Sequence, residues 1–239
     1  MMSKLAENKK TKKKKKNAPE VREEGDEKLP PPPLPAYTIK ELRDVYASYM
    51  QKDEEDGGLP VGSLVTWKPE LVDKVIPRDG HRAVVIEVLR APARPKGDVV
   101  SGHGFDREPL DIVLGAIHTD DRMYTYHYDA RRFCKWKGPL SAEDKDLVSR
   151  AQRLLETRAA PFKVGDLAVW KLGLANRTMP KYDRPALVID VLDAPVIVDE
   201  KDPASNAFME RVDVVLLAEA ERGRFITLVV DGRRIDKFE

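Results

Sequence analysis

The sequence has one cysteine, no long apolar segment and almost no net charge. Cys134 has no second cysteine to pair with, which excludes an internal disulfide and fits a reducing compartment. No stretch of about 18 apolar residues occurs, and the lysines near the N-terminus are not followed by an apolar segment. We therefore expect no membrane span, no secretory signal and a soluble, cytoplasmic protein.

The chain also lacks the sequence motifs of well-known catalytic sites. It contains no nucleophile elbow, no HExxH zinc motif and no glycine-rich nucleotide fingerprint. The stretch "SGHGFD" at 101–106 has two glycines but lacks the lysine of a phosphate loop, and we interpret it as the tip of a loop. The histidines do not have metal-ligand spacing; they are His81, His103, His118 and His127. We expect no enzymatic activity, no metal and no cofactor.

Charge is distributed unevenly along the chain. The 239 residues carry 42 basic and 41 acidic side chains, so the protein as a whole is not a polycation that would coat nucleic acid. Residues 1–36 hold ten basic and six acidic side chains, a net charge of +4, which leaves −3 for the other 203 residues. The body of the protein is therefore mildly acidic, unlike most nucleic-acid-binding domains.

Residues 1–36 form an N-terminal arm of distinct composition. They contain a lysine tract, an acidic patch and a proline run at 30–35, with almost no apolar side chains. Such a segment cannot offset the entropy lost on ordering, so we expect disorder unless a partner holds it. The tract either contacts phosphates or an acidic protein surface, or is a solvated tail. Its candidate contact residues are Lys9, Lys10, Lys12, Lys13, Lys14, Lys15 and Lys16.

The rest of the chain contains one phrase twice. "RAVVIEVLRAP" at 82–92 nearly repeats as "PALVIDVLDAP" at 185–195, and the match continues in both directions without a gap at an offset of 103. After one residue is removed from the second copy, the match continues at an offset of 102 to the C-terminus. A register kept over so many residues indicates one supersecondary unit used twice.

Each copy is predicted to contain about five short strands with turn residues between them. An Asp-x-Arg-Arg segment interrupts the last strand like a single helical turn. On "VGDLAVW", "ALVIDVL", "DVVLL" and "VVDGRRIDKF", each copy resembles the SH3-like small barrel, the group that contains Tudor and KOW modules. "VGDLAVWK", followed by a proline-bearing loop and "PALVIDVL", is also similar to uncharacterised phage and prophage proteins. The first resemblance implies two closed barrels and a binding or structural role.

Two helices are predicted beside the barrels. Thr38 and Glu41 have capping-box spacing before one apolar stripe, and Ser141 and Asp144 have the same spacing before another. We expect the second helix to seat against one or both barrels. The predicted mainly β organisation is an arm at 1–36, a helix at 37–57, a barrel at 58–138, a linker helix at 139–160 and a barrel at 161–239.

Aromatic residues at alternate positions invite two interpretations. Tyr124, Tyr126 and Tyr128 suggest a platform for stacking bases. Their counterparts in the second copy are apolar, which favours the barrel core instead. Trp67 and Trp170 occupy the same place in each copy, where packing is favoured over a ligand-facing role.

Charged residues kept in both copies are the candidate partner-binding residues, because core packing does not explain them. In each Arg-Arg pair we expect one arginine to pair with Asp129 or Asp231 and the other to be exposed. The exposed member would anchor a carboxylate or phosphate of a partner. The candidates are Arg131, Arg132, Arg233, Arg234, Lys68 and Lys171.

These observations lead to three hypotheses about function. The first is a structural protein that docks on a larger assembly of protein subunits through its barrels and arm, most concretely a phage head decoration or cement protein found in the virion or the host cytoplasm. The second is a nucleic-acid-binding module that uses the lysine tract and the arginine pairs. The third is a phage-encoded regulator or inhibitor of a host protein.

Overall fold

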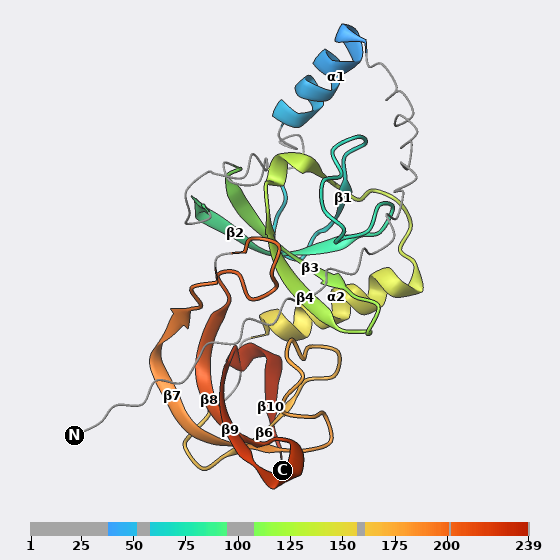
Figure 1. Ribbon diagram of the computed structural model, residues 1–239. Coiled ribbons are helices and arrows are strands. Elements are labelled where there is room, and N and C mark those ends of the chain that lie inside the picture. Colours follow the sequence, from blue (N-terminus) through green and yellow to red (C-terminus); the bar gives the residue numbers. More distant parts are fainter. Residues whose placement is uncertain (1–37, 52–57, 95–107, 157–160, 201, 239) are drawn as a thin grey trace, which may run out of the picture. The chain divides into compact units, whose positions relative to one another are not determined.

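The computed structural model describes residues 38–51, 58–94, 108–156, 161–200 and 202–238. All of them belong to one unit, residues 38–239. They form two five-stranded antiparallel sheets and two α-helices (Figure 1). The predicted arm at 1–36, with its lysine tract, and the predicted loop tip at 101–106 lie outside the described residues.

The two sheets have the same strand order. Sheet 1 runs β4-β3-β2-β1-β5, and sheet 2 runs β9-β8-β7-β6-β10. The strands of sheet 1 are β1 (Leu64–Trp67), β2 (Ala83–Ala93), β3 (Leu110–Ile117), β4 (Met123–Tyr128) and β5 (Phe133–Lys135). Those of sheet 2 are β6 (Leu167–Trp170), β7 (Ala186–Ile197), β8 (Arg211–Glu219), β9 (Phe225–Val230) and β10 (Ile235–Lys237). The predicted strands of both sequence copies are confirmed.

Strand register also agrees between the copies. Leu64 pairs with Val84 in sheet 1, and Leu167 pairs with Leu187 in sheet 2. An irregularity interrupts β2 against β3 after Val85, and the matching irregularity interrupts β7 against β8 after Val188. The two sequence copies therefore fold with the same bends as well as the same strands.

The expectation of closed barrels is wrong, because neither sheet closes among the described residues. β5 and β10 pair only with β1 and β6, while β4 and β9 pair only with β3 and β8. Each last strand is three residues long and follows a short 3-10 turn, η2 (Ala130–Arg132) or η4 (Gly232–Arg234). The 3-10 turn separates the last strand from β4 or β9, and the two strands lie at opposite edges of their sheet with no ladder between them.

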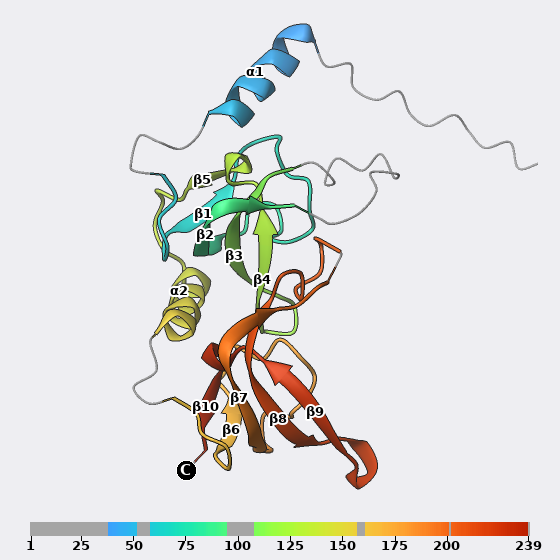
Figure 2. The ribbon, with the colours of Figure 1, turned by 90° about the vertical axis from the view of Figure 1, so that its left-hand side faces the viewer.

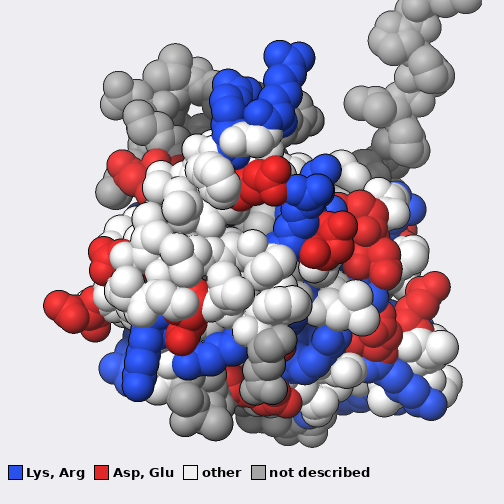
Figure 3. All heavy atoms as spheres, turned by 90° about the horizontal axis from the view of Figure 1, so that it is seen from below, with Lys and Arg blue, Asp and Glu red and all other residues white. Residues whose placement is uncertain are grey.

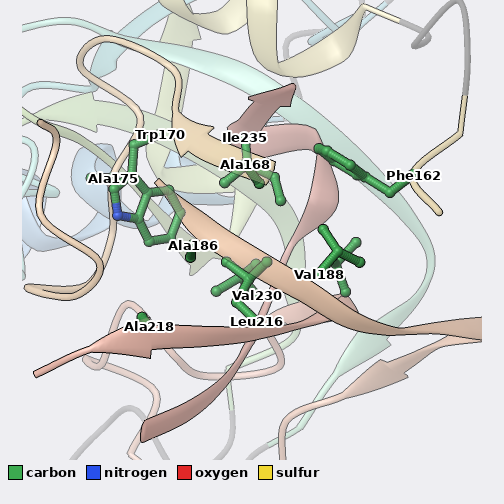
Figure 4. Close-up of a cluster of buried hydrophobic side chains, with 11 residues drawn as sticks. Phe162, Ala168, Trp170, Ala175, Ala186, Val188, Leu216, Ala218, Val230 and Ile235 are labelled. Atoms are coloured by element: carbon green, nitrogen blue, oxygen red, sulfur yellow. The ribbon is translucent and has the colours of Figure 1, made fainter. Parts of the chain in front are cut away.

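Each bent sheet encloses an apolar cluster on its inner face. Figure 4 shows the cluster of sheet 2, in which Trp170 lies among short side chains from several strands. The Nε1 atoms of Trp67 and Trp170 donate to the carbonyl oxygens of Pro77 and Pro180, each over 2.7 Å. Both tryptophans are 4% exposed, so the prediction that they pack in the core is confirmed.

The three tyrosines of β4 divide between core and edge. Tyr128 is 2% exposed and contacts Trp67 and Phe133 edge-on. Tyr126 packs against the same cluster from a half-buried position. Tyr124 is also half-buried, and its hydroxyl donates to Asp120 at the surface. The core interpretation is therefore confirmed for Tyr128 and partly for Tyr126.

Two helices precede the two sheets, α1 (Ile39–Met50) and α2 (Ala142–Leu155). Both begin with a complete capping box, as predicted, from Thr38 and Ser141. Both are shorter than the expected 37–57 and 139–160, of which 52–57 and 157–160 lie outside the described residues. The helices differ in burial, because α2 has five buried residues and α1 has none. A further 3-10 turn, η3 (Glu221–Gly223), joins β8 to β9.

The two helix caps provide a matched pair of stability tests. Ser141→Ala removes the cap of a buried helix, so we expect the free energy of unfolding in urea to fall by about 1 kcal/mol. Thr38→Ala removes the cap of a helix without buried residues, so we expect faster amide hydrogen exchange within α1 and no measurable global loss. Equal global losses in the two variants would contradict this assignment.

Candidate interaction surface

Strand alternation gives each sheet a second, outer face opposite its inner cluster. On sheet 1 the outer face is apolar and buried. The α2 residues Leu147, Ala151 and Leu154 and the loop residue Leu174 cover it. The sheet residues beneath them are Leu64, Val84, Ile86, Val113 and Met123. The prediction that the linker helix seats against the sheets is confirmed for sheet 1.

Hydrogen bonds fix the second repeat to the same face. The Met123 amide donates to the carbonyl of Gly173 over 2.8 Å. The guanidinium of Arg234 donates to the carbonyl oxygens of Met123 and Leu174 at 3.1 and 3.0 Å and to Thr125 Oγ1 at 3.0 Å. The outer face of sheet 1 is thus covered by α2 and by loops of the second repeat.

The outer face of sheet 2 is partly exposed among the described residues. Its exposed apolar side chains, with their exposed fractions, are Leu167 at 40%, Leu187 at 37%, Phe225 at 66% and Val229 at 39%. Their counterparts in sheet 1 are Leu64 at 8%, Val84 at 0%, Met123 at 0% and His127 at 7%. Figure 2 shows α2 beside sheet 1 and no described helix beside β8 and β9. Two faces with the same place in the fold therefore differ in burial.

Acidic residues border this apolar surface. Asp190, Glu219 and Asp236 pair in register with Val215, Phe225 and Val169, which places their side chains on the outer face. Glu219 is engaged by Arg184, whereas Asp190 is exposed and accepts from its neighbouring amide of Val191. On the end of the molecule seen from below, uncharged side chains form a broad area with both signs of charge around it (Figure 3). On the outer face of sheet 2, exposed apolar side chains lie beside acidic ones, a composition typical of a protein interaction site.

The first arginine of each pair lies as predicted. Arg131 pairs with Asp129 at 2.6 Å, and Arg233 pairs with Asp231 at 2.7 Å. Each aspartate also accepts from the amide of its arginine, which caps the 3-10 turn. Burial opposes ionisation of Asp129, but hydrogen bonds from Arg131 hold its pKa below the usual value.

The second arginine of each pair is not exposed, so that expectation is wrong. Arg132 forms ion pairs with Asp73 and Glu108. Arg234 is 2% exposed and joins the two repeats, and its complete burial lowers its pKa. The contacts of both guanidinium groups lie within the chain.

The two lysines hold helix ends, which the sequence analysis did not foresee. Lys68 Nζ donates to the carbonyl oxygens of Ser48 and Gln51 at the end of α1. Lys171 Nζ donates to the carbonyl oxygen of Arg153 near the end of α2, over 2.7 Å. Carbonyl groups at a helix C-terminus attract cations. The signal available in the sequence was therefore a lysine at the same position of both copies, each with a predicted helix before its copy.

Tyr49 is a second residue whose role the sequence analysis missed. Its hydroxyl donates to Asp129 over 2.7 Å and accepts from Arg131, so it attaches α1 to the 3-10 turn of sheet 1. Burial and the hydrogen bond to Asp129 raise the pKa of Tyr49 to about 12. A tyrosine within an apolar stripe does not by itself reveal such a polar partner.

Other classes of site have little support in the described part of the chain. Those residues contain no group of three or more His, Cys, Asp or Glu side chains that could hold a metal ion. None of the described helices is both long and apolar enough to cross a membrane.

The ionisation of His127 can show whether the second repeat packs on sheet 1, since its ring contacts Phe208 of the second repeat edge-on. Burial, and then the charge of Lys74, lower the pKa of His127 to about 4. Between the unfolded value of about 6.5 and this folded value, the unfolded chain binds more protons, so stability is complete above about pH 6.5 and decreases as pH falls. We expect a loss of roughly 3 kcal/mol by about pH 4.

The matched variant is His127→Val, which introduces the residue that sheet 2 has at this position. It should remove this part of the pH dependence, measured as the difference between urea unfolding curves of wild type and variant from pH 7 to 4. Parallel pH profiles of the two proteins would show that His127 is not buried by the second repeat.

Comparison with known proteins leaves this surface to be interpreted from its own geometry. No protein-family model matches the chain, and neither a search of curated proteins nor a search of solved structures finds a match.

Proposed function

We propose that the chain is a non-enzymatic interaction protein that docks on a larger protein assembly through the outer face of sheet 2. One observation carries this proposal: the outer face of sheet 2 is exposed, although its counterpart on sheet 1 is buried. Sheets with two apolar faces are stable when both are covered. Phe225, at 66% exposure, gains most from a partner.

The repeated architecture supports a binding role. Five strands in one order, with a 3-10 turn before a short last strand, fit an open variant of the SH3-like small barrel. Modules of that type are usually interaction domains. A virion accessory protein, such as a phage head decoration or cement component, is the most concrete version, because the arm and the phage resemblance favour a protein that contacts several subunits. Mass spectrometry of purified particles tests that version, which absence of the chain from virions would exclude.

The chemistry of the surface favours a protein partner over nucleic acid. Its exposed side chains are aliphatic or aromatic and its rim contains Asp190, whereas phosphates require lysine and arginine. The arginine pairs make contacts within the chain. An amphipathic helix with an apolar stripe is the partner of best fit, because α2 covers the matching face of sheet 1 in that manner.

Co-purification with the surface variant Leu187→Glu/Phe225→Ser tests the proposed role. We expect tagged wild-type protein to retain protein partners from its native lysate after nuclease treatment. The double variant should lose them, because it places a charge and a hydroxyl in the centre of the surface. Val88→Ser, at a 52% exposed position of sheet 1, is the control and should retain them. Retention that depends only on nucleic acid would contradict the proposal.

A further inference from the structure

A second unpartnered apolar surface lies on the first repeat. The helix α1 has no buried residues. One stripe of α1 holds four exposed apolar side chains: Ile39 at 71%, Leu42 at 57%, Tyr46 at 63% and Met50 at 48%. Spacings of three and four residues place them on one side of the helix. The chain thus carries an apolar helix stripe in its first repeat and an apolar sheet face in its second.

The chain itself shows how such surfaces combine. The second repeat places a helix, a turn and an arginine on the outer face of sheet 1. The helix is α2, the turn contains Gly173 and Leu174, and the arginine is Arg234. We call these three parts, the helix, the turn and the arginine, the front of a repeat. The chain thus contains an intramolecular contact between the front of the second repeat and the outer face of the sheet of the first repeat.

The first repeat has the same front. Its turn at Glu70 has φ 66°, where Gly173 has φ 75°. The amide of Leu71 donates to the carbonyl oxygen of Lys68, and in the same way the amide of Leu174 donates to the carbonyl oxygen of Lys171. The side chain of Arg132 donates to the carbonyl of Leu71 over 3.1 Å, and that of Arg234 donates to Leu174 over 3.0 Å. Each lysine also holds the helix before its own sheet.

Charge is arranged in the same way on both sheets. Burial opposes the charge of Arg233, but its bond to Asp231 and the nearby carboxylate of Glu87 on sheet 1 keep its pKa raised. Asp190 occupies the position of Glu87 on sheet 2, since both follow the matching irregularity. In a second copy, the counterpart of Arg233 is Arg131. The exposed carboxylate of Asp190 therefore complements the front of the first repeat.

One difference sets how α1 would seat. The positions of the buried α2 residues Leu147, Ala151 and Leu154 correspond to Asp44 and Ser48 of α1 and to its C-cap residue Gln51, all of which are polar. The apolar stripe lies on the other side of α1. The turn differs as well. Arg150 packs so close to Gly173 that a side chain at Gly173 would meet its guanidinium, whereas the first repeat has Glu70 at the position of Gly173 and Ala47 at the position of Arg150. A second copy would therefore meet the sheet 2 face with the exposed stripe of α1, which is the opposite side from the one that corresponds to the buried side of α2, and the contact would not repeat the internal one atom for atom.

We propose that the outer face of sheet 2 binds the α1 stripe of a second copy of this chain, head to tail. This inference rests on the proposed function and names its partner. The two contacting surfaces differ, so the association is heterologous, and each added copy leaves a free α1 at one end and a free sheet face at the other. The assembly grows as a filament unless its rotation closes a ring.

Two variants separate the two surfaces. The head variant Leu42→Glu/Tyr46→Glu changes only the α1 stripe, and the tail variant Leu187→Glu/Phe225→Ser changes only the sheet 2 face. All four positions are exposed, so we expect both variants to keep the wild-type circular dichroism spectrum and melting temperature. Full-length wild type should self-associate with increasing concentration in sedimentation velocity. Each variant alone should be a monomer.

Mixing the variants provides the decisive measurement. The head variant keeps an intact sheet face and the tail variant keeps an intact α1, so the mixture should form a one-to-one dimer and nothing larger. Pairing of α1 with α1, or of sheet face with sheet face, would instead be abolished by only one variant and would give no mixed dimer. Either result overturns the head-to-tail contact.

Failure of this inference is distinguishable from failure of the proposed function. A wild type that stays monomeric at every concentration overturns self-association. If that monomer still retains another protein, and the tail variant loses it, docking through sheet 2 stands with a different partner. If neither self-association nor retention occurs, both proposals fail.

Discussion

An antiparallel sheet that is apolar on both faces has to bury both of them, and this requirement governs the described part of the chain. Sheet 1 buries its inner face around Trp67 and its outer face beneath α2 and the second repeat. Arg234 lies in that outer contact. Burial of its guanidinium is unfavourable, and three hydrogen bonds to Met123, Leu174 and Thr125 offset part of that desolvation free energy. The two repeats are therefore held by packing as well as by their covalent connection.

Sheet 2 has the same strand order, but its outer face stays partly exposed among the described residues. Its inner face is as well packed as that of sheet 1, but Leu187 and Phe225 remain at the surface. Exposed apolar residues grouped on one face make that face the candidate interaction surface of the chain. In the first repeat, the apolar stripe of α1 is exposed as well. The described part of the chain thus has two exposed apolar surfaces, one on each repeat.

Much of this fold was predictable from sequence, and the limits have physical reasons. Alternation and turn residues gave the strands, and the capping boxes at Thr38 and Ser141 gave the helix starts. Sheet closure was not predictable, since pairing between distant edges leaves no local pattern. The exposed face of sheet 2 was also missed, because Leu64 and Leu167 are the same residue type and only tertiary contact decides which is covered. For the same reason the sequence could not show that Arg132 bonds within its own repeat whereas Arg234 bonds to the other repeat.

The lysine at the end of the first strand of each repeat has a consequence for how the helices are attached. Lys68 and Tyr49 attach α1 to sheet 1 by hydrogen bonds, while α1 itself has no buried residue. Such hydrogen bonds contribute only about 1 kcal/mol each. The helix can therefore detach by local opening while sheet 1, covered on both faces, stays folded.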